Sequence, residues 1–189
     1  MFFVVKRKFS GYLKNNRYVF LIAFTAIIVG AISGAFGVAR MGITEIVPPQ
    51  NISDNSIIMS SFFENLKFLA WIAVWGINAV GAPVIVYLLY TKGAMLSASL
   101  YGLLVMESTN QFVRIISTMP YIVCTVASIV VLAQGGLCCS FDVGKVVMMG
   151  KNQRNISKNV CKMAISFVVA SLIAFIGGIC EGVFKVNIT

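Results

Sequence analysis

Long apolar stretches alternate with short polar segments along the chain. Tyr18 to Ala39 carries no charge, and further uncharged stretches cover 68–91, 93–106, 115–141 and 163–180. About 20 apolar residues in a helix cross a hydrocarbon layer of about 30 Å. The pattern therefore predicts helices that cross a membrane.

We expect an all-α fold, a polytopic membrane helix bundle with about five transmembrane helices in a single membrane domain, residues 1–189. The expected spans are 18–39, 68–91, 93–110, 115–141 and 163–180. The second is expected to bend at Pro83, where a backbone donor is lost. The third is short before Glu107, so it needs Lys92 to snorkel toward the interface, and a re-entrant segment is the alternative.

The distribution of positive charge predicts the topology. With five spans and an inside N-terminus, the inside segments hold eleven of the fifteen Lys and Arg residues, five of them in a basic cytoplasmic loop, 142–162. The outside then holds only Arg40, Lys67, Arg114 and Lys185. Cytoplasmic segments carry such an excess of positive charge, so we expect the N-terminus inside and the C-terminus outside. With four spans the basic loop would lie outside.

Composition supports a membrane protein and weakens most enzyme classes. Hydrophobic residues make up 59% of the 189 residues, and charged residues only 11%. Membrane lipid is therefore the expected surrounding of the chain. The net charge of +9 lies between apolar stretches and forms no continuous basic face, so nucleic acid is not an expected partner. Histidine is absent, which removes the usual general base and the commonest metal ligand.

The spans contain few polar side chains. No ionisable residue is expected deep in a span, where one would mark a functional site. Asn78 and Gln134 are the deep amides, and interhelical hydrogen bonds are their simplest role. The cysteines, including the neighbouring Cys138 and Cys139, show neither CxxC spacing nor a disulfide pattern, so packing is their expected role. We predict no catalytic residue, no cofactor and no metal.

Small residues at close-approach spacing predict where helices touch. Such spacing lets two backbones approach, within one chain or between copies in a homo-oligomer. With the two amides and the expected bend, the candidate packing residues are Gly30, Gly34, Gly37, Asn78, Pro83, Gln134, Gly178 and Gly182.

Several short motifs resemble a known family. They are Asn15-Asn16-Arg17, Gly30 to Gly37, Phe63-Glu64-Asn65-Leu66-Lys67, Trp75-Gly76, Gly81-Ala82-Pro83 and Lys92-Gly93. Together they are similar to the stage II sporulation protein M family, over nearly the whole chain. Relatives often carry Pro-His-Gly and a nearby Glu at the start of the fourth span. Here Tyr121 and Ile122 follow Pro120, so a role tied to that histidine does not carry over.

The resemblance implies a scaffold in forespore engulfment. Such a scaffold sits in the cell membrane on the mother-cell side of the sporulation septum, and it holds the peptidoglycan-degrading stage II sporulation proteins D and P there. The hydrolytic chemistry would belong to those partners. The outside loop 40–67 and the segment near Glu107 are then the expected docking regions, with candidate docking residues Glu45, Asp54, Phe62, Phe63, Glu64 and Glu107.

A permease subunit is the alternative function. In that reading Asn78, Gln134 and the bend at Pro83 line a path through the membrane. An even or repeated pattern of spans would favour transport, and none is visible in the sequence.

Overall fold

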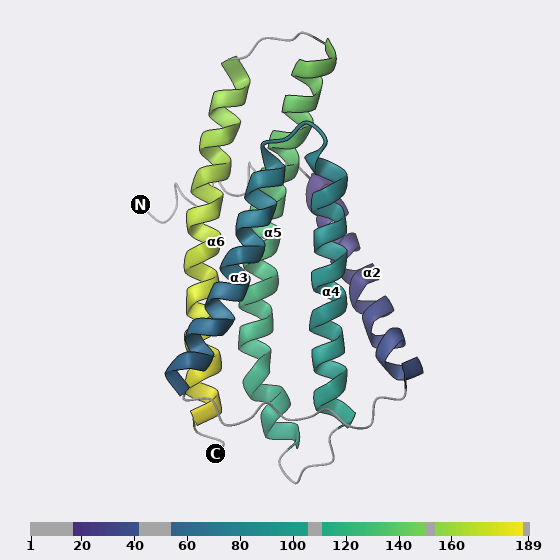
Figure 1. Ribbon diagram of the computed structural model, residues 1–189, viewed down its shortest axis with the longest axis vertical. Helices are drawn as coiled ribbons and strands as arrows, with labels where there is room; N and C mark the ends of the chain where they lie inside the picture. Colours follow the sequence, from purple (N-terminus) through teal and green to yellow (C-terminus); the bar gives the residue numbers. More distant parts are fainter. Residues whose placement is uncertain (1–16, 42–53, 106–110, 150–153, 187–189) are drawn as a thin grey trace.

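The computed structural model describes residues 17–41, 54–105, 111–149 and 154–186, and its described part is all-helical. The helices are α2 (Arg17–Met41), α3 (Asp54–Gly76), α4 (Gly81–Val105), α5 (Gln111–Met149) and α6 (Arg154–Val186). They run alongside one another in a single elongated bundle (Figure 1). The predicted helix bundle is confirmed.

Among the described residues, four helices are long and apolar enough to cross a membrane. The apolar stretches are Arg17–Arg40, Gly81–Gly102, Thr118–Met148 and Ser157–Cys180. α3, with 23 residues, is also long enough for a crossing.

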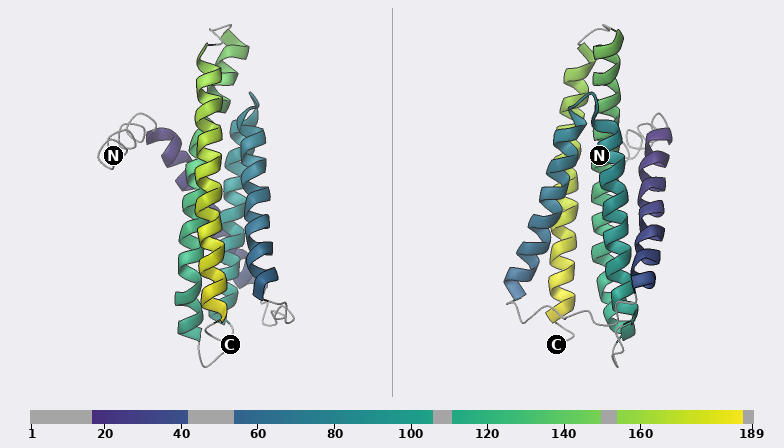
Figure 2. Two further views of the ribbon diagram at one scale, coloured as in Figure 1. Left: turned by 90° about the vertical axis from the view of Figure 1, so that its left-hand side faces the viewer. Right: turned by 45° about the vertical axis from the view of Figure 1, so that its right-hand side comes forward.

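α5 is the central helix of the bundle. In its apolar stretch 61% of the residues are buried, against 17 to 28% in the other three. Leu132 and Leu137 of α5 are fully buried, as are Leu69 and Ile72 of α3 and Ile85 and Leu89 of α4. α6 packs along α5, and α3 lies against both, whereas α2 packs mainly against α4 on the other side (Figure 2).

The predicted boundary between the second and third spans is wrong. No helix breaks at Lys92, which lies inside α4, and the chain turns instead at residues 77–80. In this turn the Asn78 amide donates to the Trp75 carbonyl, and the Gly81 amide donates to the Asn78 carbonyl, both at 3.0 Å. The Asn78 side-chain oxygen accepts from the Val80 amide at 3.2 Å, the short-range bond that makes Asn a good turn residue.

Two further boundaries differ from the prediction. The expected outside loop 40–67 is helical from Asp54 onward, so its second half belongs to α3. Pro83 produces no bend in the middle of a span, because it is the third residue of α4. Proline is well tolerated in the first turn of a helix, where the missing donor has no intrahelical partner.

Glycines allow α2 and α4 to touch backbone to backbone. A side chain at Gly30 would collide with the Tyr90 carbonyl oxygen, and one at Gly34 would lie 2.6 Å from the Ala94 Cα. From the opposite side, a side chain at Gly93 would meet the Ile27 carbonyl oxygen. We call Gly30, Gly34 and Gly93 the α2–α4 seam.

Candidate functional site in the middle of the bundle

Lys92 lies halfway along α4. It is the twelfth residue of this helix, roughly 16 Å from its start, and it is half-buried. Its Nζ lies 5.3 Å from the centre of the Phe68 ring on α3, and the Glu64 carboxylate interacts with it electrostatically. The expectation that no ionisable residue lies deep in a span is therefore wrong. Inside a membrane such a residue is by default a candidate functional site.

α3 carries two further charges in its middle. Glu64 and Lys67 are the eleventh and fourteenth residues of this helix, and both side chains are exposed at the surface of the bundle. A charge at the centre of a membrane helix costs about 2.5 to 3.5 kcal/mol on insertion scales. These two exposed charges therefore raise the cost of placing α3 in lipid.

A hydrogen bond between α3 and α5 lies next to Glu64, Lys67 and Lys92, which we call the charge cluster. Asn65, the neighbour of Glu64, is 3% exposed, and its Nδ2 donates to the Tyr121 hydroxyl of α5 at 3.1 Å. The Asn65 Oδ1 has no hydrogen-bond partner in the part of the chain that the structure describes. Tyr121 of α5 therefore takes part in the site beside Asn65.

The site joins motifs that are far apart in the sequence. The motif Phe63 to Lys67 supplies the α3 charges and Asn65, Lys92-Gly93 supplies the α4 charge, and Tyr121 comes from α5. The opposite charges of Glu64 and Lys67, three residues apart, were a signal for this part of the site in the sequence. The position of Lys92 was missed because a lysine among apolar residues looks like the end of a span.

The candidate packing residues have different surroundings. Gly30 and Gly34 lie in the α2–α4 seam, whereas Gly37 has no atom within 4 Å of the place where a side chain would begin. Gly178 is buried in α6. A Cβ placed on its neighbour Gly177 would lie 2.9 Å from the Cys124 Cβ of α5. Gly182 belongs to α6, but its surroundings lie outside what the structure describes.

The two deep amides differ in their roles. Asn78 is an exposed turn residue whose carbonyl accepts from the Ser140 hydroxyl of α5 at 2.8 Å, so its expected position in the middle of a span is wrong. Gln134 is 5% exposed, and its Nε2 has no partner among the described residues. Its predicted interhelical hydrogen bond through this nitrogen is therefore not found.

The residues of the transport alternative do not line one path. Asn78 is exposed in the turn, Gln134 is buried inside α5, and Pro83 is exposed on α4. Pro83 borders a shallow apolar groove of about 440 Å³ between α2 and α4, to which neither amide belongs. Among the described residues these three positions thus form no common cavity.

The candidate docking residues are also dispersed. Glu45 and Glu107 lie outside the described residues, and Asp54 begins α3. Phe62 packs edge to face on Phe175 of α6, with ring centres 5.3 Å apart, so it contributes to the bundle. Phe63 and Glu64 are exposed on α3, where they are available for a contact, but they lie on a helix rather than in a loop.

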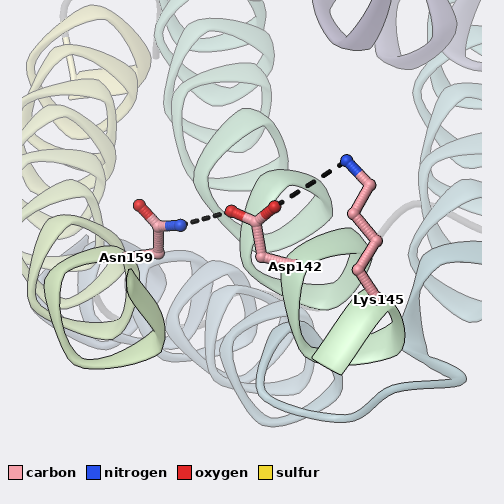
Figure 3. A network of polar contacts seen from close by, with 3 residues as sticks. All are labelled: Asp142, Lys145 and Asn159. Atoms are coloured by element: carbon pink, nitrogen blue, oxygen red, sulfur yellow. Dashed lines mark hydrogen bonds and ion pairs between the residues drawn. The ribbon is translucent and has the colours of Figure 1, made fainter. Parts of the chain in front are cut away.

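A polar network joins α5 and α6 near the ends of these helices at 149 and 154. The Asn159 amide donates to one oxygen of Asp142, and the Lys145 ammonium lies 4.0 Å from the other (Figure 3). Gly144 lies level with the α3–α4 turn, because a Cβ placed on it would be 3.5 Å from the Ala79 carbonyl oxygen. The end of α5 and the start of α6 extend past this turn, as Figure 1 shows.

The contact between Lys92 and Phe68 predicts a measurable coupling. A cation over an aromatic face contributes about 0.5 to 2 kcal/mol, more where water is excluded. In a double-mutant cycle with Lys92→Met and Phe68→Leu, we expect the thermal stabilities in detergent to give a coupling energy in this range. The control cycle pairs Phe68→Leu with Lys67→Met and should give no coupling, because Lys67 is exposed and has no such ring contact. Equal values in both cycles would contradict the assignment.

Comparison with known protein families gives the identity of this bundle. The chain matches the family model of stage II sporulation protein M over residues 11–184, most of its length. No curated protein matches the chain, and no solved structure matches it. The match covers α2 to α5 in full, α6 up to residue 184, and every residue of the charge cluster. The chain therefore belongs to the stage II sporulation protein M family and is a sporulation-related membrane protein.

Proposed function

We propose that this chain is a non-enzymatic membrane scaffold that localises peptidoglycan-degrading partners at the sporulation septum during forespore engulfment. The observation that carries the proposal is the family match over residues 11–184. The partners by family resemblance are the stage II sporulation proteins D and P. The corresponding location is the mother-cell membrane at the septum.

The proposal includes five membrane crossings with an inside N-terminus. α3 and α4 are joined by the four-residue turn 77–80 and run antiparallel, so if α4 crosses, α3 must return through the same layer. The turn 77–80 and the link after α5 then lie inside, and the links after α2 and α4 lie outside. This keeps the basic segment after Asp142 in the cytoplasm.

Cysteine labelling tests this topology. In a variant without native cysteines, Ile77→Cys should react with an impermeant maleimide only after the membrane is opened, because Ile77 is exposed in the inside turn. Ser108→Cys should react in intact cells. The reverse pattern, or equal labelling of both sites from outside, would overturn the five-crossing arrangement.

The partners act on peptidoglycan, which lies outside the membrane, so docking belongs at the outside end. The residues between α2 and α3 form the longest connection at that end. Replacing residues 43–52 by a neutral linker tests this, because the substitution stops before α3 begins at Asp54. Loss of partner recruitment with normal protein levels is expected. Unchanged recruitment would move the docking surface elsewhere.

The test of the function itself is a deletion in the native sporulating host. We expect the mother-cell membrane to stop at the septum, and fluorescently tagged partner hydrolases to lose their septal focus. Restoring the wild-type gene should restore both. Completed engulfment with correctly placed hydrolases in the deletion strain would overturn the scaffold proposal.

A further inference from the structure

One face of α3 is left without a partner in the bundle. Its buried positions include Asn65, Leu69, Ile72 and Gly76, which face α5, α6 and α4. The opposite face is exposed at positions that follow the helical repeat, and five of them lie between residues 63 and 74. We call them the α3 outer stripe: Phe63, Glu64, Lys67, Trp71 and Val74.

The charges distinguish this stripe from the other exposed helix faces. The outer faces of α2 and of α6 beyond Met163 carry apolar side chains through their middle parts, as lipid contact requires. Among the described helices only α3 exposes charges halfway along, Glu64 and Lys67. Charged residues in membrane segments pair with one another or face water. Glu64 interacts with Lys92 of its own chain, whereas Lys67 has no ion pair with another helix among the described residues, so the stripe favours a partner that carries charge.

We propose that the α3 outer stripe is the contact surface between two copies of this chain. Glu64 and Lys67 have opposite sign and lie one turn apart on the same face, so the stripe is complementary to itself. A two-fold contact requires such self-complementarity. The proposal rests on the proposed crossing of α3, since only then are the charges inside the membrane.

The geometry of a shared membrane fits this pairing. Two copies with the same orientation place their α3 helices parallel, with a two-fold axis along the membrane normal. Glu64 of one copy then faces Lys67 of the partner subunit across an axial offset of about 4.5 Å, which both side chains can span. The second pair forms by symmetry. Lys67 gains an opposite partner, Glu64 gains one in addition to Lys92 of its own chain, and Trp71 and Val74 supply apolar contact beside them.

The alternative contact through small residues is already occupied. Gly30 and Gly34, the spacing typical of membrane helix dimers, are used within the chain against α4. The α3 outer stripe lies away from this seam, so pairing of two copies leaves the fold of each copy unchanged.

Charge reversal provides the test, in membranes that contain two differently tagged copies of the full chain. Glu64→Lys alone makes both charges positive, and Lys67→Glu alone makes both negative. We expect either variant to recover about tenfold less of its tagged twin than wild type does in a pull-down from mild detergent. Co-expression of Glu64→Lys with Lys67→Glu should restore recovery, because the two chains then carry opposite charges.

The mixed pair also shows that both variants fold, so loss in the separate pairs is not unfolding. A chain that carries both reversals should pair with itself like wild type. The proposal is overturned if the single reversals leave pairing unchanged. It is also overturned if neither the mixed pair nor the double reversal restores pairing. If a different protein bound the α3 outer stripe, neither combination would restore pairing between two copies of this chain.

Cross-linking locates the contact independently. In a variant without native cysteines, Trp71→Cys should form a dimer with a short bismaleimide in intact membranes. Leu172→Cys, equally exposed on α6, is the matched control and should remain monomeric. Dimer from the control alone, or cross-linking of Trp71→Cys only to a different protein, would overturn the assignment.

Discussion

Gly30→Leu is expected to detach α2 from α4 and to leave little folded protein. The Cβ of the new side chain would lie 2.0 Å from the Tyr90 carbonyl oxygen and 3.0 Å from the Tyr90 Cα. These are backbone atoms, so no rotamer change relieves the collision. Separation of the helices would also open the contact at Gly34 and Gly93. We expect a loss of about 3 kcal/mol or more, beyond an ordinary overpacking cost.

The measurement is the thermal unfolding of purified protein in detergent, together with the yield of monodisperse material. Gly37→Leu is the matched control, on the same helix and with the same change in size. Nothing lies within 4 Å of the Gly37 position, and leucine favours a helix more than glycine does. The control should unfold at or above the wild-type temperature. Equal damage from both substitutions would show that the seam has no special role.

Gly76→Ala is expected to loosen the contact of three helices at the end of α3. The added methyl group would lie 2.8 Å from the Gly136 Cα of α5 and 2.7 Å from the Met163 sulfur of α6. The methionine can move, but the α5 backbone cannot, so α3 must shift away from the central helix. We expect a cost of about 1 to 3 kcal/mol, measured as a lower unfolding temperature.

Gly144→Ala is the control for this substitution. Its methyl group would meet only the Ala79 carbonyl oxygen at 3.5 Å, an ordinary van der Waals distance. The change should be neutral or slightly stabilising, because alanine favours a helix more than glycine does. If Gly144→Ala lowered the unfolding temperature as much as Gly76→Ala, the three-helix contact would not be the cause.

The helical architecture followed from the apolar stretches, whereas the position of one turn did not. Lys92 marks the end of a hydrophobic stretch by composition alone. In the bundle, the Phe68 ring and the Glu64 carboxylate offset its charge, so the helix continues through it. Both groups come from α3, and hydropathy along the chain contains no information about contacts between helices.

Turn chemistry was the signal for the true boundary. Gly76, Asn78, Gly81 and Pro83 lie within eight residues, in the order expected for a helix end, a turn and a new helix start. The apolar residues Ile77 and Val80 concealed this pattern, because they make the segment look like part of a span. Both are exposed in the structure, at 51% and 67%.

The candidate site was only partly visible in the sequence. The spacing of Gly30 and Gly34 indicated a close helix contact, but it could not say which helix would be the partner, or that Gly37 would lie in the open. Asn65 showed no special feature beside the charges around it. Its hydrogen bond to Tyr121 joins residues 56 positions apart, a contact that only the packing of α3 on α5 creates.

The α2–α4 seam also sets an order of assembly during synthesis. α2 contacts mainly α4, and its glycines meet a helix whose Gly93 follows Gly30 by 63 residues. At translation rates of about 5 to 20 residues per second, this partner emerges roughly 3 to 13 s later. The first helix must therefore wait in the bilayer or beside the insertion machinery, with its glycine face uncovered, while α3 passes. Rapid release into lipid would expose that face to other membrane helices, so slow handover of the nascent chain would favour correct assembly.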